Sequence, residues 1–196
     1  MNLKFKNVNK EKKNIKRVDK IYKESFTQDE RYRFKFLLKA AKRKDNLFYV
    51  IYDNYSLIGL TYLTFEENNI FILYLAINNK YQGQGYGSAV LSALKEKYPG
   101  YNFILDIEAI KKDVPNYEQR VRRKKFYQKN GFKLTNLGIR YDSDKFELMT
   151  TGKRTELDSN LITRLLLKVH SPFFQRITKF YKFKLYKIRN YQSKNE

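Results

Sequence analysis

The chain of 196 residues carries 41 Lys and Arg against 20 Asp and Glu, which gives a formal net charge of +21 at pH 7. Hydrophobic residues make up 42% of it, so it is expected to fold around a core. Cysteine is absent, which excludes disulfides, thiol catalysis and cysteine-ligated metal sites. No apolar run approaches the roughly 20 residues that span a bilayer, and the N-terminus lacks the apolar stretch of a signal peptide. These features predict a cytoplasmic, bacterial protein.

The excess of positive charge has two interpretations. It is what an anionic partner such as nucleic acid, a membrane or the ribosome would require. It is also what codon drift in an AT-rich genome produces, because Lys, Asn, Ile, Tyr and Phe are all abundant. The length fits one domain, or one domain with an extension.

In the first part of the chain, apolar residues alternate in short runs or recur every three to four positions. Three consecutive strands joined by short polar turns predict an antiparallel meander. Thr27 or Asp29 is the expected N-cap of the second helix. The predicted elements are an edge strand at residues 3–8, helices at 11–26 and 29–42, and strands at 47–52, 57–65 and 70–77.

The second part begins with a helix that ends at Pro99-Gly100, followed by a strand at residues 101–108. With the strand at 70–77 these form a βαβ unit with parallel strands. A helix at 117–130 ends at Gly131 as a C′ glycine. A strand at 132–134 follows, and the last strand is either 139–141 or 146–150.

The character of the sequence changes after residue 150. Apolar and basic positions segregate in two predicted helices, 161–169 and 173–186, which Ser171-Pro172 separates. We therefore divide the chain into a domain at residues 1–150 and a basic amphipathic helical extension at 151–196.

The stretch between the strand at 70–77 and the next helix is rich in glycine, with the sequence Gln-Gly-Gln-Gly-Tyr-Gly at residues 82–87. A strand, a glycine-rich turn and a helix aim backbone N–H groups and the positive end of a helix dipole at one point, which suits a phosphate. Glycine permits close approach and positive φ. No Gly-Lys-Ser/Thr follows, so this is not a Walker A loop. Ser88 replaces the last glycine of the dinucleotide fingerprint.

The loop does match the pattern Gln/Arg-x-x-Gly-x-Gly/Ala through Gln82, Gly85 and Gly87. A second pattern, aromatic-Tyr-x-x-x-Gly-Phe, occurs at residues 126–132. Together, in this order, they resemble the GNAT superfamily of N-acetyltransferases, over about residues 1–150. The resemblance implies an α/β (α+β) fold with a mixed sheet: an antiparallel meander, then a βαβ unit whose central parallel strands splay apart. The helical extension would follow this domain.

The resemblance also implies acetyl-coenzyme A as co-substrate and no metal. The pantetheine arm would pair with backbone in the gap between the splayed strands, and the pyrophosphate would bind the glycine-rich loop. Many relatives carry an Asn seven residues before the Tyr; here that position is Arg120, and the nearest asparagine is Asn116. Alternatively Arg120, Arg122 or Arg123 faces a coenzyme phosphate. The expected coenzyme-binding residues are Leu75, Ala76, Ile77, Gln82, Gly83, Gln84, Gly85, Tyr86, Gly87, Ser88 and Asn116.

Two residues are expected to carry the chemistry. Tyr127 resembles the family's general acid, because a phenol can donate to the coenzyme sulfur without ionising first. Glu108, at the C-terminal end of the strand beside the gap, is the candidate general base, directly or through water. The alternatives are a packed helix tyrosine and a solvated strand-end carboxylate. Glu66 and Glu67 could shape the acceptor site, and His170, the only histidine, is not expected to take part.

The leading hypothesis is an acetyl-coenzyme A-dependent N-acetyltransferase that acts on a primary amine of a small molecule or a protein. The alternative is a catalytically silent GNAT scaffold that binds nucleic acid or a membrane. An anionic surface, contacted by the basic extension, and a second copy of the chain in a homodimer are further candidate partners.

Overall fold

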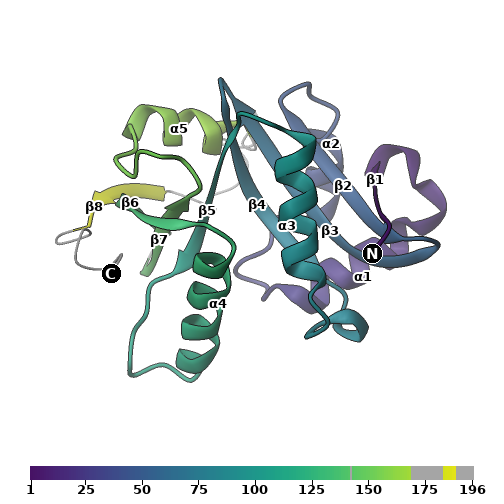
Figure 1. The fold of residues 1–196 in the computed structure, drawn as a ribbon, viewed down its shortest axis with the longest axis horizontal. Helices are drawn as coiled ribbons and strands as arrows, with labels where there is room; N and C mark the ends of the chain where they lie inside the picture. Colours follow the sequence, from purple (N-terminus) through teal and green to yellow (C-terminus); the bar gives the residue numbers. More distant parts are fainter. Residues whose placement is uncertain (142, 169–182, 189–196) are drawn as a thin grey trace. The chain divides into compact units, whose positions relative to one another are not determined.

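The computed structural model describes residues 1–141, 143–168 and 183–188 (Figure 1). The chain forms two compact units. Unit 1 consists of Met1–Phe65 and Ile72–Gly100, and unit 2 consists of Glu66–Phe71 and Tyr101–Glu196. Strand β4 (Asn69–Ile77) begins in unit 2 and ends in unit 1. Among the described residues, no helix has the length and apolar character needed to cross a membrane.

Unit 1 contains strands in the order β1-β2-β3-β4. Tight turns at Asn54 (φ +52°) and Glu67 (φ +50°) join β2 to β3 and β3 to β4, as expected for two-residue hairpins. Most residues of β2 and β3 are buried, which explains their nearly continuous apolar runs. The predicted edge strand and meander are confirmed. The strand bounds are β1 Leu3–Asn7, β2 Asn46–Asp53 and β3 Ser56–Glu66.

Helices cover both faces of the strands of unit 1. In Figure 1, α3 (Tyr86–Lys97) lies in front of the strands, and α1 (Ile15–Ser25) and α2 (Phe34–Ala40) lie behind them. Each helix buries an apolar stripe. The buried residues of α1 and α3 are Val18, Ile21, Tyr22, Val90, Leu91 and Leu94.

The two N-terminal helices start later than the sequence pattern predicts. Short 3-10 turns precede α1. The predicted cap of the second helix is wrong: the N-cap of α2 is Arg33, and it makes no side-chain capping bond. The Glu30 carboxylate instead accepts hydrogen bonds from the backbone N–H and hydroxyl of Thr27 (2.8 and 3.0 Å). These bonds close a turn where the periodicity alone predicts helix.

At Gly59 of β3 two backbone segments approach too closely for any side chain. A Cβ there would lie 2.1 Å from the carbonyl oxygen of Ala76 on β4. We expect Gly59→Ala to destabilise the fold by the upper end of roughly 1–3 kcal/mol, because backbone must move. Urea denaturation measures this. The control Gly100→Ala has open space and only left-handed strain (φ +81°); equal losses in the two variants would contradict the packing argument.

Unit 2 contains the first residues of β4 and then β5, β7, β6 and β8. Residues 69–71 of β4 pair in parallel with residues 102–104 of β5, whereas the β5–β7, β6–β7 and β6–β8 pairs are antiparallel. The predicted mixed sheet with a βαβ unit is therefore confirmed. Both candidates for the last strand exist, one within β6 and the other within β7. The bounds are β5 Asn102–Glu108, β6 Lys133–Tyr141, β7 Asp144–Thr150 and β8 Phe183–Lys187.

Helix α4 (Tyr117–Lys129) ends in a Schellman motif. Gly131 is left-handed (φ +82°), its N–H donates to Gln128 O (2.9 Å), and the N–H of Phe132 donates to Tyr127 O (3.0 Å). The rings of Tyr127 and Phe132 are 5.6 Å apart, which is the apolar contact that accompanies this motif. The predicted C′ glycine is confirmed, and the aromatic-Tyr-x-x-x-Gly-Phe pattern has a structural cause.

The extension is partly helical and partly strand. Its first helix, α5 (Ser159–Leu167), begins at an Asp158 side-chain cap and buries Ile162, Leu165 and Leu166. Of the second predicted helix, residues 173–182 lie outside the described residues, as do Ser171, Pro172 and His170. The prediction is wrong for residues 183–186, which belong to β8.

Gly138 explains why β8 forms. The Tyr186 ring lies over Gly138 of β6, where a Cβ would be 2.4 Å from it, and the Tyr186 hydroxyl donates to Phe146 O of β7 (3.1 Å). Pairing with a distant strand thus overrides the local helical pattern.

Candidate functional site

The glycine-rich loop of unit 1 leads from β4 directly into α3. Gly83 (φ +75°) and Gly85 (φ +82°) are both left-handed, which confirms the conformation expected from the sequence. Gly85 is the N-cap of α3 and offers no capping side chain. No side chain of the N-cap residue therefore occupies the first N–H groups of the helix, and together with the positive end of the helix dipole they suit an anion.

The side chains of two glutamines in this loop make hydrogen bonds that hold it in place. The amide of Gln82 donates to Ile77 O and to the Asn79 side-chain oxygen, both at 2.9 Å. The amide of Gln84 donates to Lys80 O (2.9 Å). The Gln82 side chain therefore ties the loop to the end of β4, which leaves the loop backbone as the part available to a ligand.

The first residue of α3 is also fixed. The Tyr86 hydroxyl donates to the Asp53 carboxylate (2.9 Å), which also accepts from the N–H of Asn2 (2.8 Å). The Asn2 N–H and the Tyr86 hydroxyl lower the pKa of Asp53, whereas the Asp53 carboxylate raises the pKa of Tyr86. Gly87 and Ser88 follow within α3.

Residues 75–77 form the end of β4, before the loop. The Tyr74 O accepts from the Thr61 hydroxyl (2.9 Å), the Ala76 carbonyl lies against Gly59, and the N–H of Asn78 donates to Ile58 O (2.7 Å). Neighbouring β3 thus holds this segment by backbone contacts. Leu75 and Ile77 are partly exposed and Ala76 is buried.

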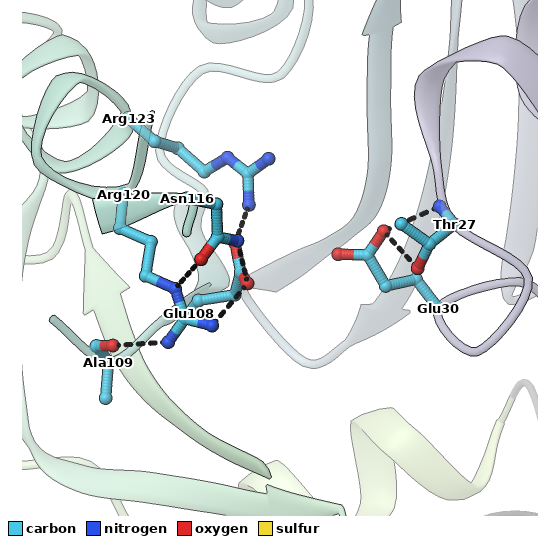
Figure 2. Close-up of polar contacts among 7 residues, drawn as sticks. All are labelled: Thr27, Glu30, Glu108, Ala109, Asn116, Arg120 and Arg123. Carbon is cyan, nitrogen blue, oxygen red and sulfur yellow. Dashed lines mark hydrogen bonds and ion pairs between the residues drawn. The ribbon is translucent and has the colours of Figure 1, made fainter. Parts of the chain in front are cut away.

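In unit 2, the end of β5 and the start of α4 meet in a polar cluster (Figure 2). The Glu108 carboxylate, with a side chain only 13% exposed, accepts from Arg120 at 3.0 Å and from Arg123 at 2.7 Å. The Asn116 amide donates to it as well (3.0 Å). Sequence reasoning singled out all four residues, but it did not predict that they contact one another.

The guanidinium of Arg120 donates from all three of its nitrogens. Besides Glu108, it donates from Nε to the Asn116 side-chain oxygen (2.9 Å) and from Nη1 to Ala109 O (2.8 Å). Arg120 and Asn116 therefore lock the start of α4 to the end of β5. Among the described residues of unit 2, Arg123 donates from a single nitrogen, to Glu108, so its other N–H groups can meet another anion.

Tyr127 lies one helical turn after Arg123 on the same face of α4. Its hydroxyl makes no hydrogen bond to the described residues of unit 2. Burial raises the pKa of Tyr127 to about 12; the positive charge of Arg123 acts against this shift and the carboxylate of Asp106 adds to it. The phenol is thus protonated and available as a donor.

Glu66 and Glu67, named as acceptor-site candidates, hold α5 instead. Arg164 donates to Glu66 (2.6 Å) and to Glu67 (3.0 Å), and Lys168 also pairs with Glu66. The Lys168 ammonium and the Arg164 guanidinium hold the pKa of Glu66 below its usual range. This turn precedes β4, whereas the glycine-rich loop follows it.

Sequence reasoning missed one carboxylate in unit 1. One Glu30 oxygen accepts both Thr27 donors (Figure 2), and the other makes no hydrogen bond or ion pair with the described residues of unit 1. The backbone carbonyl of Glu30 accepts from the Tyr74 hydroxyl (2.8 Å), which fixes the turn to β4. Glu30 lies in the first turn of the helix predicted at residues 29–42, and nothing in that pattern sets it apart.

Comparison with known proteins gives consistent results. Residues 44–134 match the family model described as the acetyltransferase (GNAT) domain. A curated relative, YjbC of Bacillus subtilis (strain 168), whose name describes it as a candidate acetyltransferase, is 29% identical over 103 residues. That match covers 49% of this chain and 51% of the relative, so the chain spans about half the length of this relative.

Solved structures share the fold. A protein of the GNAT family from Bacteroides thetaiotaomicron superposes with a TM-score of 0.66 at 21% identity, covering 89% of this chain and 98% of that one. The PaiA N-acetyltransferase of Thermoplasma acidophilum, solved in complex with coenzyme A, gives a TM-score of 0.52 at 21% identity, covering 76% and 98% of the two chains.

Proposed function

We propose that the chain is an acetyltransferase of the GNAT superfamily, whose domain model residues 44–134 match, and that it transfers the acetyl group of acetyl-coenzyme A to a primary amine. The observation that supports this most directly is the loop at residues 82–87, with two left-handed glycines at the N-terminus of α3. Such a loop stabilises a pyrophosphate through backbone N–H groups and the helix dipole. Among the structural neighbours, the PaiA enzyme was solved with coenzyme A bound.

In the proposed reaction the amine nitrogen bonds to the thioester carbon and the carbon–sulfur bond breaks. Backbone N–H groups of residues 75–77 polarise the carbonyl, and one such donor is worth roughly 3–4 kcal/mol. The proton that the amine loses goes to a base, because an aliphatic ammonium has a pKa of about 10.4. Tyr127 donates a hydrogen bond to the departing sulfur.

Glu108 is the proposed base, and its neighbours impose a condition on that role. It already accepts three hydrogen bonds, two of them from guanidinium groups, so a proton must go to the lone pair that remains on the oxygen facing Arg123. The second candidate is Glu30, one oxygen of which makes no hydrogen bond or ion pair with the described residues of unit 1. The base is therefore tested with both carboxylates.

We expect Glu108→Gln to shift or abolish the limb of the pH–rate profile along which activity rises with pH. It should also lower the free energy of unfolding by about 1–3 kcal/mol, because Arg120 and Arg123 lose their shared anion. Glu118→Gln, on the exposed side of α4, is the matched control. A wild-type profile in Glu108→Gln would move the base role to Glu30, which Glu30→Gln then tests in the same assay.

The function itself is tested by two measurements on the full chain. Acetyl-coenzyme A should raise the melting temperature, and free thiol should appear when members of a panel of primary amines are added. Stabilisation by the coenzyme without thiol release from any amine would favour the silent scaffold. The amines that cause thiol release identify the class of acceptor, which cannot be inferred from the fold alone.

A further inference from the structure

Unit 1 contains a cavity of about 500 Å³ between α1 and the segment that leads from β4 to the glycine-rich loop. None of residues 82–88 lines it, so it is separate from the proposed pyrophosphate cradle. Its volume lies within the range typical of small-molecule sites. The lining residues are Arg17, Lys20, Ile21 and Glu24 of α1, Leu57 of β3, and Asn78, Asn79, Lys80 and Tyr81.

The side chains that line this cavity carry more positive than negative charge. Glu24 pairs with Lys20 across one turn of α1 (3.7 Å). Arg17 and Lys80 make no side-chain hydrogen bond or ion pair with the described residues of unit 1. Two cations from different elements thus face one cavity without an anion of their own.

The remaining polar groups are also donors. The side-chain oxygen of Asn78 accepts from the N–H of Lys80 (3.2 Å), and that of Asn79 accepts from Gln82 (2.9 Å). Their NH₂ groups remain available for a ligand. The cavity therefore offers guanidinium, ammonium and amide donors, which matches a group with several acceptor oxygens.

Part of the wall is apolar. Tyr81 lines the cavity and is only half-buried, and its ring is held edge-on against Tyr86 with the centroids 5.6 Å apart. Ile21 and Leu57 are 5% and 2% exposed, so the chain itself already covers them. A ligand here would place an apolar body on the Tyr81 ring while its anion meets Arg17 and Lys80. A bare inorganic ion would leave that apolar surface uncovered.

We propose that this cavity is a second small-molecule site of the chain, which binds a phosphate ester with a small apolar body. The phosphate contacts Arg17, Lys80 and the amide donors, and the body lies against the Tyr81 ring. The ester belongs either to the acceptor itself or to a separate effector. Because the site lies outside the glycine-rich loop, its binding is measured without acetyl transfer, and its failure leaves the proposed function untouched.

Titration calorimetry with phenyl phosphate tests the proposal, in physiological salt and with saturating coenzyme A present. We expect saturable binding that is at least about 10-fold tighter than that of inorganic phosphate or phenol, because each of these lacks half of the contacts. No saturable binding, or binding that coenzyme A abolishes, would overturn the proposal, since the second result places the anion in the coenzyme site.

Matched variants locate the binding. Arg17→Gln with Lys80→Gln should weaken phenyl phosphate binding about 10- to 100-fold, as loss of two charge-assisted contacts predicts. Lys16→Gln with Lys44→Gln removes the same charge from exposed positions of unit 1 outside the cavity and should change affinity less than about 2-fold. Equal weakening by both pairs would show a general charge effect and contradict the site.

The source of the ester follows from inhibition of the transferase assay. Competition between phenyl phosphate and the amine indicates that the acceptor carries the phosphate. Inhibition or activation that is not competitive with the amine indicates an effector. Competitive and non-competitive effects both support the cavity as a binding site. Transferase kinetics that stay unchanged at phenyl phosphate concentrations that saturate the calorimetric signal would exclude a link to the reaction. That result would overturn the assignment of the ester to the acceptor or to an effector.

Discussion

Gly85→Val is expected to weaken acetyl-coenzyme A binding by roughly 10- to 10³-fold. Gly85 is left-handed (φ +82°), and a β-branched residue holds that conformation only with strain of about 1–3 kcal/mol. Loss of a hydrogen bond to a charged phosphate costs about 1–3 kcal/mol more, and each 1.4 kcal/mol is about a factor of ten in affinity. A Cβ here would find only the Met1 side chain, at 3.9 Å, so packing is not the cause. Titration calorimetry measures the change.

Gly100→Val is the matched control for this prediction. Gly100 lies just past the other end of α3, has φ +81° and has open space around it, so valine there introduces the same strain. It should lower stability as Gly85→Val does and leave coenzyme affinity unchanged. With a pantetheine fragment that lacks the pyrophosphate, Gly85→Val should bind like wild type. Equal affinities of Gly85→Val and wild type for the whole coenzyme would show that the phosphates bind elsewhere.

The parts of the fold that could be predicted are those that local chemistry decides. Gly85 and Gly131 mark positions that need positive φ, and both helix boundaries they define are found where the sequence places them. The buried strands β2 and β3 could be predicted because each is a nearly continuous apolar run. In each case the signal and its structural cause lie within a few residues of each other.

The wrong predictions of secondary structure arise where side chains outside the predicted segment determine its conformation. Residues 183–186 satisfy a helical pattern, but their alternation also fits a strand, and Gly138 with Phe146 O selects the strand. The predicted start of α2 is wrong because the Glu30 carboxylate accepts from the N–H and the hydroxyl of Thr27 and closes a turn there. The choice between helix and strand at residues 183–186, and between turn and helix before α2, cannot be predicted from one segment alone.

The candidate site shows the same division. The spacing of Arg120, Arg123 and Tyr127 places them on one face of α4 from sequence alone. That Glu108 would join the two arginines depends on where β5 ends relative to α4, which no local pattern encodes. In the cluster Glu108 is an anchored carboxylate as well as a candidate base. The pH profile of Glu108→Gln is therefore needed to test its role as a base.

Tyr127→Phe is expected to lower kcat about 10²-fold or more, with little change in coenzyme affinity. Burial raises the pKa of Tyr127 to about 12, well above the roughly 8.5 of a thiol, so the phenol keeps its proton and acts as a hydrogen-bond donor to the departing sulfur. A hydrogen bond to a charged group is worth about 1.5–3 kcal/mol, and 2.7 kcal/mol is about 10² in rate. Because the raised pKa keeps the donor form present up to about pH 10, the size of the defect should not vary across the neutral range. Single-turnover rates measure it.

Tyr117→Phe, on the same helix, controls for loss of a hydroxyl from α4 and should keep the wild-type rate. A second measurement separates a role in the reaction from packing against Phe132: an acetyl thioester of a more acidic thiol needs less help to leave, so the Tyr127→Phe defect should shrink with it. A merely structural tyrosine would give the same defect with every thioester. An unchanged single-turnover rate in Tyr127→Phe would remove the phenol from the reaction. The departing sulfur would then fall to Arg123, which lies one turn earlier and donates from only one nitrogen to the residues that the structure describes in unit 2.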